Sequence, residues 1–248
     1  MFRLQSYFSY YWHAKKNPTS EVEWIQDWYN LVKRDLPQEA AHVINEYRKA
    51  LHRDHRAFHQ DQQTTTVSKR YTLTSVDLAY GKVLYHTAQY LGAKTFLELG
   101  TSLGVSSAYL ALAHPSMQGV SIDANPNAIE VATAKFRQHD LLKKVSFYAD
   151  TFENALPSIL ANSDPIDICF VDGDHSYHAT ITNTQYIKPY LSEHAVIILD
   201  DIRWSEGMYK AWETLKKDDS FGVTLDLGRI GLLWKTTKIM SREHLILR

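Results

Sequence analysis

The chain has 248 residues, with 27 Lys and Arg against 28 Asp and Glu and a formal net charge of −1. This balance disfavours a nucleic-acid-binding protein, whose domain would usually be clearly basic, and favours a small-molecule or protein substrate. We find no secretory leader pattern and no run of 18 apolar residues, so we expect no membrane partner. The single cysteine, Cys169, lies in an apolar run and is expected to be a buried, inert thiol. Together these features favour a cytoplasmic location.

The first 70 residues are expected to form a helical appendage. Ser20 and Glu23 make a capping signature for a helix over about 20–35, and Pro37 can open a second helix with an apolar stripe. Residues 59–70 are polar, so we predict a flexible loop that could act as a lid. Residues 1–70 would then be a cap or a homodimer contact, and residues 71–248 the main domain.

Strands and helices alternate through most of the remaining chain. After a helix that ends at Gly92, strands are predicted at residues 95–99, 118–123, 144–149, 166–171 and 195–200, with helices between them. Such alternation implies a parallel, doubly wound α/β sheet. Two further strands, at 221–226 and 230–235, flank a turn with Gly228 and should form an antiparallel hairpin. The expected sheet is therefore seven-stranded and mostly parallel.

The segment KTFLELGTSLGVSS, residues 94–107, reads as strand, glycine turn and helix start. Gly100 and Gly104 allow the backbone to turn sharply and approach a ligand at the amino end of a helix. A dinucleotide site would show G-x-G-x-x-G, which Ser102 and Val105 interrupt. The segment resembles the first motif of the class I S-adenosylmethionine-dependent methyltransferases, E/D-x-G-x-x-x-G, through Glu98, Gly100 and Gly104.

Further residues at the strand ends extend this donor site. Asp123 lies roughly 20 residues beyond the glycine turn, where a carboxylate can accept hydrogen bonds from a ribose diol, and its alternative role is to cap a helix. The resemblance places Asp150 and Thr151 beside the adenine ring, although either could instead cap the next helix. The predicted donor-binding residues are Glu98, Gly100, Thr101, Ser102, Gly104, Ser106, Asp123, Ala124, Asp150, Thr151 and Asp172.

Acidic residues also follow the fourth and fifth strands. Asp172 is followed by Asp174 and His175 in one segment, and Asp200 adjoins Asp201 in the other. Carboxylates brought this close repel unless one is protonated or a cation neutralises them. Oxygen ligands suit Mg²⁺ or a similar hard cation, so a metal site has a physical motive.

Residues 72–237 resemble the class I fold as a whole, and specifically the small-molecule O-methyltransferases of catechol and macrolide-sugar type. The resemblance implies a divalent cation held by Asp172, Asp200 and Asp201, although catechol enzymes carry an amide where Asp201 stands. It also implies that His175, with Asp172, is the catalytic pair that removes the hydroxyl proton, although Asp174 or His175 could instead cap the following helix, 178–191. Arg203 and Trp204 are expected to line the acceptor pocket, with core packing as the alternative for Trp204.

The predicted function is transfer of a methyl group from S-adenosylmethionine to a hydroxyl of a small molecule, assisted by a divalent cation. One alternative keeps the fold and the donor but places the acceptor on nitrogen or a carboxylate, without metal. Another is a non-catalytic donor-binding or interaction module whose aromatic N-terminal segment docks a partner.

Overall fold

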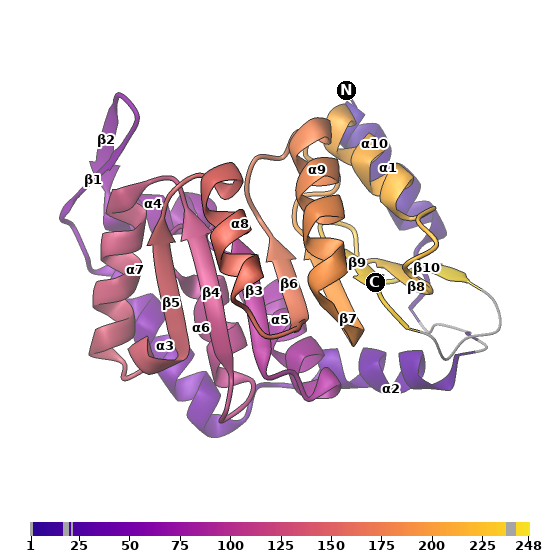
Figure 1. Cartoon of the computed structure of the whole chain (residues 1–248), viewed down its shortest axis with the longest axis horizontal. Coiled ribbons are helices and arrows are strands. Elements are labelled where there is room, and N and C mark those ends of the chain that lie inside the picture. Colours follow the sequence, from indigo (N-terminus) through magenta and orange to yellow (C-terminus); the bar gives the residue numbers. More distant parts are fainter. Residues whose placement is uncertain (1, 17–19, 21, 237–241) are drawn as a thin grey trace. The chain divides into compact units, whose positions relative to one another are not determined.

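The computed structural model describes residues 2–16, 20, 22–236 and 242–248. Figure 1 shows the helices and strands along the chain. The chain forms two compact units, one made of residues 1–30 and 164–248 and the other of residues 31–163. The sequence-based boundary near residue 70 stays a prediction.

The second unit contains the first three strands of the predicted α/β alternation. β3 (Thr95–Leu99), β4 (Gln118–Asp123) and β5 (Val145–Ala149) pair in parallel in the order β3-β4-β5. Each strand leads into a helix: α6 (Val105–Leu112), α7 (Pro126–Gln138) and α8 (Phe152–Ala161). Asn125 caps α7 by accepting from the Asn127 amide, and Pro126 occupies its first turn. These elements confirm the predicted alternation closely.

The part of the second unit that precedes β3 differs from the prediction. It contains α3 (Gln38–His52), α4 (Val67–Thr74) and α5 (Leu78–Leu91). The segment predicted as a loop over 59–70 instead forms an antiparallel hairpin, β1 (Ala57–Gln60) with β2 (Gln63–Thr66), followed directly by α4. Asp61, with φ of 52°, makes its tight turn, and the run of threonines has the β-branched side chains that favour a strand. A role as a lid stays a prediction.

The first unit holds the remaining strands of the sheet. β6 (Ile166–Val171), β7 (Leu191–Leu199), β8 (Val223–Asp226), β9 (Gly231–Trp234) and β10 (Glu243–Ile246) lie in the order β10-β8-β9-β7-β6. β9 is antiparallel to both β7 and β8, which confirms the terminal hairpin. Among the described residues, β10 is an eighth strand where seven were predicted, and it pairs in parallel with β8. The helices α9 (Tyr177–Ile187) and α10 (Glu206–Leu215) follow β6 and β7.

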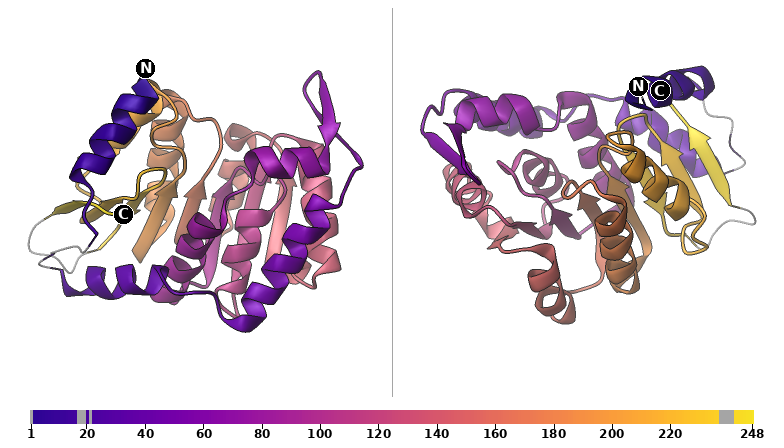
Figure 2. Two further views of the ribbon diagram at one scale, coloured as in Figure 1. Left: turned by 180° about the vertical axis from the view of Figure 1, so that it is seen from behind. Right: turned by 90° about the horizontal axis from the view of Figure 1, so that it is seen from above.

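The N-terminal helix α1 (Phe2–His13) belongs to the first unit, where it lies near the end of the chain (Figure 2). The Tyr10 hydroxyl donates to the Leu247 carbonyl, and Lys15 forms a parallel bridge with Leu247. Further along, α2 (Glu23–Val32) places Trp24 and Trp28 against the Trp234 ring of β9, with ring centroids 4.7 and 5.8 Å away. Both ends of the sequence therefore help to build one hydrophobic core.

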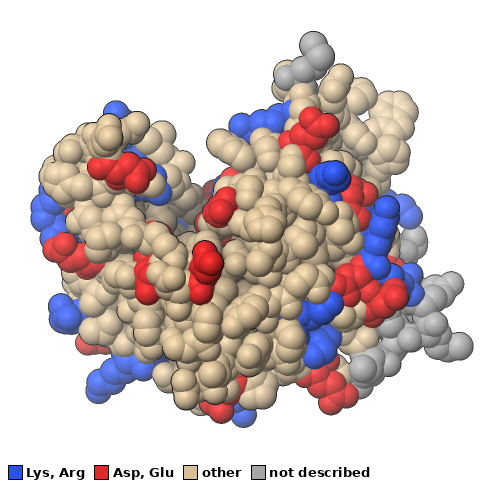
Figure 3. Space-filling model, turned by 45° about the horizontal axis from the view of Figure 1, so that its top comes forward, with Lys and Arg blue, Asp and Glu red and all other residues tan. Residues whose placement is uncertain are grey.

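The described surface agrees with the near-neutral composition. On the face shown in Figure 3, Lys and Arg side chains are interspersed with Asp and Glu, without an extended patch of one sign. Within the described ranges, none of the helices has the length and apolar character needed to cross a bilayer.

Candidate active site

The glycine turn links β3 to α6 in the second unit. Gly100, Ser102 and Gly104 all have positive φ, at 106°, 46° and 74°. A side chain at position 104 would place its Cβ 2.7 Å from the hydroxyl oxygen of Tyr47, which itself donates to the Leu103 carbonyl. Glycine is therefore required at position 104 both by the backbone conformation and by the close approach of α3.

Glu98 lies inside the protein below this turn. Its side chain is fully buried, and the hydroxyls of Ser107 and Ser121 both donate to its Oε2 atom. Burial raises the pKa of Glu98 to about 7, although the serine hydroxyls oppose this shift. Thr101 and Ser106, also predicted to contact the donor, are buried, and Thr101 shares a hydrogen bond with Ser121. These side chains hold the turn in shape.

Asp123, at the end of β4, is joined directly to the glycine turn. Its Oδ2 atom accepts from the Ser102 amide at 2.8 Å, and its Oδ1 atom accepts from the Asn125 amide at 2.9 Å. The N-cap of α7 is Asn125, so Asp123 does not take the capping role considered as its alternative. Asp123 is half-buried and Ala124 is exposed, so this strand end reaches the surface beside the turn.

Asp150 and Thr151 follow β5, and Thr151 caps the next helix. Thr151 is the N-cap of α8 and accepts from the Asn154 amide, while Asp150 Oδ1 accepts from the Asn154 side chain at 3.0 Å. The Asp150 amide donates to the Asp123 carbonyl at 3.1 Å, which brings the ends of β4 and β5 together. Both residues are exposed. The predicted adenine contact is compatible with this exposure and stays a prediction.

The acidic residues predicted at the ends of β6 and β7 do come together in the first unit. The Asp200 amide donates to the Val171 carbonyl, so Asp172 and Asp200 leave neighbouring strands side by side. His175 Nε2 lies 3.5 Å from Asp172 Oδ1 and 3.9 Å from Asp201 Oδ2. We call Asp172, His175, Asp200 and Asp201 the acidic cluster.

Arg229 also contacts the acidic cluster, although the sequence analysis did not predict it as a site residue. Its Nε and Nη2 atoms donate to the two oxygens of Asp200 at 2.8 and 2.5 Å, and Nε lies 3.2 Å from Asp201 Oδ1. Arg229 comes from the turn between β8 and β9, and the Ile202 amide donates to its carbonyl. A basic residue in the hairpin next to β7 was the available signal, but its partner depends on strand order.

The electrostatics of the cluster follow from burial and like charges. Burial raises the pKa of Asp172 well above its ordinary value, and the neighbouring carboxyls of Asp200 and Asp201 add to the effect, while Arg229 opposes it. The pKa of Asp201 is also raised, by burial and by Asp200. Asp172 therefore keeps its proton to a higher pH than an exposed carboxyl would.

The carboxyl oxygens are of the type that Mg²⁺ prefers, but their arrangement does not fit a metal ion. Within the described part of the chain, no group of three or more His, Cys, Asp and Glu side chains is placed to hold one. Both oxygens of Asp200, which is only 1% exposed, already accept from Arg229.

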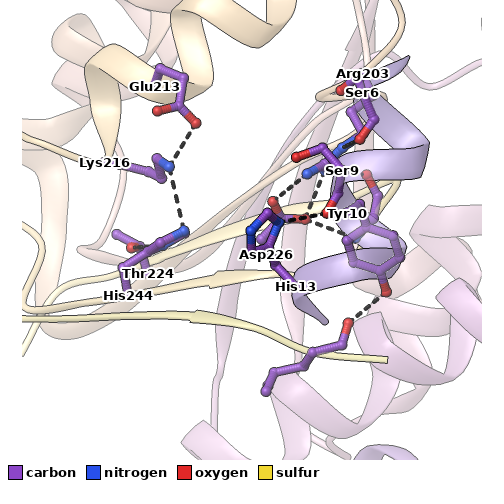
Figure 4. Close-up of polar contacts among 12 residues, drawn as sticks. Ser6, Ser9, Tyr10, His13, Arg203, Glu213, Lys216, Thr224, Asp226 and His244 are labelled. Atoms are coloured by element: carbon purple, nitrogen blue, oxygen red, sulfur yellow. Dashed lines mark hydrogen bonds and ion pairs between the residues drawn. The ribbon is translucent and has the colours of Figure 1, made fainter. Parts of the chain in front are cut away.

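The structure corrects the role predicted for Arg203. Its side chain is 2% exposed and pairs with both oxygens of Asp226 at 2.8 and 2.7 Å. It also donates to the carbonyls of Gly228 and Ser6, and the latter contact ties it to α1 (Figure 4). Arg203 is thus part of the buried framework and does not line a pocket, because Asp226 offers it a charged partner in the core.

Trp204 remains exposed beside the acidic cluster. It is 50% exposed, its amide donates to the Asp201 carbonyl, and the Arg3 guanidinium lies 4.4 Å from its ring centroid. Tyr7 is half-buried on the same helix as Arg3, and burial followed by the charge of Asp201 raises its pKa. The helix α1 thus places Arg3 and Tyr7 close to the cluster, which the aromatic character of the N-terminus alone did not indicate.

Comparison with known proteins agrees with this fold. Residues 97–202 match a family described as a methyltransferase domain. The O-methyltransferase TomG from Streptomyces achromogenes, involved in tomaymycin synthesis and solved with S-adenosylmethionine, has a TM-score of 0.60 at 17% identity, covering 88% of this chain and 100% of TomG. An O-methyltransferase from Bacillus cereus in complex with S-adenosylhomocysteine has a TM-score of 0.59 at 17% identity, covering 86% and 96% of the two chains. The Podospora anserina methyltransferase PaMTH1, bound to S-adenosylhomocysteine, has a TM-score of 0.61 at 16% identity, covering 90% and 99%.

The order of elements and the antiparallel strands near the C-terminus thus give the chain a Rossmann-like α/β fold, which it shares with these methyltransferases, and residues 97–202 match the methyltransferase domain model. Several of the solved structures with this fold are named as O-methyltransferases.

Proposed function

We propose that this protein transfers a methyl group from S-adenosylmethionine to a hydroxyl of a small molecule. The observation that carries the choice of a hydroxyl is the position of His175 between the carboxyls of Asp172 and Asp201, where an imidazole can accept a proton. The names of the O-methyltransferases with the same fold support this choice.

The second unit would hold the donor. The turn from Gly100 to Gly104 presents the amino end of α6, and Asp123 fixes the Ser102 amide within that turn. The Asp123 carboxylate keeps lone pairs beyond these two backbone contacts, so it can also accept from a ribose diol. Exposed Ala124, Asp150 and Thr151 continue the same edge of the sheet.

The first unit would hold the acceptor and remove its proton. When bound, the donor would supply a methyl group carried on a sulfonium sulfur. The acceptor oxygen would form the new O–C bond as the C–S bond breaks, and the sulfur would leave as the neutral thioether. If His175 donates from Nε2 to Asp172, then Nδ1 is the ring atom that accepts the hydroxyl proton. Asp172 and Asp201, on either side of His175, would orient the ring. Trp204 and Tyr7 would offer an apolar wall for the acceptor.

The donor half is tested by calorimetric titration with S-adenosylhomocysteine. We expect the wild type to bind and Gly104→Ala to bind much more weakly, because its Cβ would displace Tyr47. Gly92→Ala is the matched control: φ there is also positive, at 62°, but nothing lies within 4 Å of the added Cβ. Equal affinities for all three proteins would contradict the assignment of this turn.

The acceptor half is tested by release of S-adenosylhomocysteine over a panel of phenols, catechols and sugars. For any acceptor turned over, we expect His175→Ala to lower kcat by about 100-fold or more, the usual contribution of a general base. The loss should shrink as pH rises and the hydroxyl ionises unaided. Unchanged kcat in His175→Ala would rule out this base, and transfer only to amines or carboxylates would favour the metal-independent alternative.

A further inference from the structure

The acidic cluster already contains a positive charge. Arg229 lies across Asp200 with one nitrogen on each carboxylate oxygen, and its Nε atom also reaches Asp201. Asp172 follows the neighbouring strand, where the Val171 carbonyl accepts from the Asp200 amide. A guanidinium is planar and always positively charged. This bidentate ion pair is therefore stronger and more directional than a lysine–carboxylate pair would be.

The backbone fixes Arg229 in this place. β9 is antiparallel to β7 with Leu199 opposite Gly231, so the turn that precedes β9 runs beside Asp200 and Asp201. The Ile202 amide donates to the Arg229 carbonyl at 2.9 Å, and the Arg229 amide donates to the Leu227 carbonyl. Arg229 therefore does not reach the cluster from a free chain end but from a hydrogen-bonded turn.

A divalent cation would compete with this arrangement. It would have to approach oxygens that already accept from Arg229, next to a fixed positive charge, and the repulsion is strong because Asp200 is almost fully buried. Burial alone would lower the pKa of Arg229, but the hydrogen bonds to Asp200 and the charges of Asp200 and Asp201 raise it instead. The Arg229 side chain therefore stays positively charged at every pH at which the protein is folded.

We propose that Arg229 is a built-in cation that takes the place of a divalent metal, so that Asp172, Asp200 and Asp201 bind no metal in this protein. The guanidinium keeps the carboxyls from repelling one another and leaves Asp172 and Asp201 to orient His175. One consequence of this proposal is that a chelator should not affect methyl transfer, and this consequence rests on the function proposed above. The other consequence, that the three carboxyls bind no metal, does not depend on that function.

The test is binding of Mn²⁺, followed by the electron paramagnetic resonance signal of the free ion, and of Mg²⁺ by calorimetry. We expect no stoichiometric binding to the wild type at up to millimolar cation. Arg229→Gln removes the charge and should raise Mn²⁺ affinity by about tenfold or more, the scale of change when groups around a metal site are altered. The double variant Arg229→Gln with Asp200→Asn should bind Mn²⁺ no more tightly than the wild type. Arg229→Lys, which keeps a positive charge, should also show no increase in Mn²⁺ affinity.

Arg242→Gln is the matched control, since Arg242 also pairs with an aspartate, Asp219, but at the exposed surface. It should bind no Mn²⁺. Stoichiometric binding by the wild type that Asp200→Asn abolishes would overturn the proposal without reference to any variant of Arg229. Failure of folded Arg229→Gln to gain affinity would also overturn it. Titration with S-adenosylhomocysteine in parallel separates the two proposals, because loss of donor binding would refute the methyltransferase function while leaving the metal result intact.

Discussion

Glu98 shows how one residue of the donor turn serves the fold. Its carboxyl is fully buried and accepts from Ser107 and Ser121, and burial raises its pKa to about 7. The folded state therefore binds a proton more tightly than the unfolded chain does. Stability is fully present below about pH 4.5, the unfolded pKa, and falls as pH rises through the folded pKa near 7.

We expect Glu98→Gln to flatten this pH dependence. In the wild type the free energy of unfolding should decrease by about 3 kcal/mol between pH 5 and 8, at roughly 1.4 kcal/mol for each unit of pKa shift. The amide keeps the shape and an acceptor oxygen but cannot ionise. Urea unfolding at several pH values measures this, and parallel pH profiles for the two proteins would contradict it.

The acidic residues of the first unit and their arginine partners show which contacts between residues can be predicted from the sequence and which cannot. Asp172, Asp200 and Asp201 were predicted to meet because each directly follows a strand, and parallel neighbouring strands end at the same edge. Arg229 and Arg203 were missed or misassigned because their partners, Asp200 and Asp226, are set by strand order. A charge pair between distant segments leaves no local pattern.

At the scale of elements, buried polar contacts attach α1 to the rest of the first unit. Arg203 joins Asp226 of β8 to the Ser6 carbonyl of α1, and its guanidinium also lies 5.1 Å from the Tyr10 ring centroid. Figure 4 shows these groups meeting beside β8. The N-terminal helix is thus part of the fold of this unit.

We predict that Arg203→Ala lowers the free energy of unfolding by about 3–5 kcal/mol, because it leaves the buried Asp226 charge without its partner. Thermal or urea unfolding measures the loss. The control Arg242→Ala breaks an exposed pair with Asp219 and should cost no more than about 1 kcal/mol. A similar small loss in both variants would mean that Arg203 does not anchor α1.

At the scale of the whole molecule, the outer face of α1 is exposed and apolar. Leu4, Phe8, Tyr11 and Trp12 are 80%, 70%, 59% and 77% exposed, and their spacing places them on one side of the helix. The ring of Phe8 is stacked on that of Trp12, with centroids 6.3 Å apart. The homodimer through the N-terminal helices stays a prediction, and this apolar face is where we expect its contact.

We predict that sedimentation velocity shows a dimer for the full chain and a monomer after Phe8→Glu with Trp12→Glu. The charges would have to be buried in the contact, which disfavours association. Tyr186→Glu is the control, because Tyr186 is also an exposed aromatic residue but belongs to a different helix, α9. A wild type that sediments as a monomer at all concentrations would refute the dimer.

The sequence by itself determined the α/β alternation, the terminal hairpin, the glycine turn and the grouping of carboxyls at the strand ends, because periodicity, glycine and strand-end position are local properties of a chain. It did not reveal the hairpin β1–β2, whose polar residues resemble a loop, or β10, whose partner β8 lies earlier in the chain. Only the tertiary structure decided that Arg203 is a buried anchor and that Arg229 neutralises Asp200. Those roles depend on which charged groups from distant segments come together in the interior, where water cannot screen their charge.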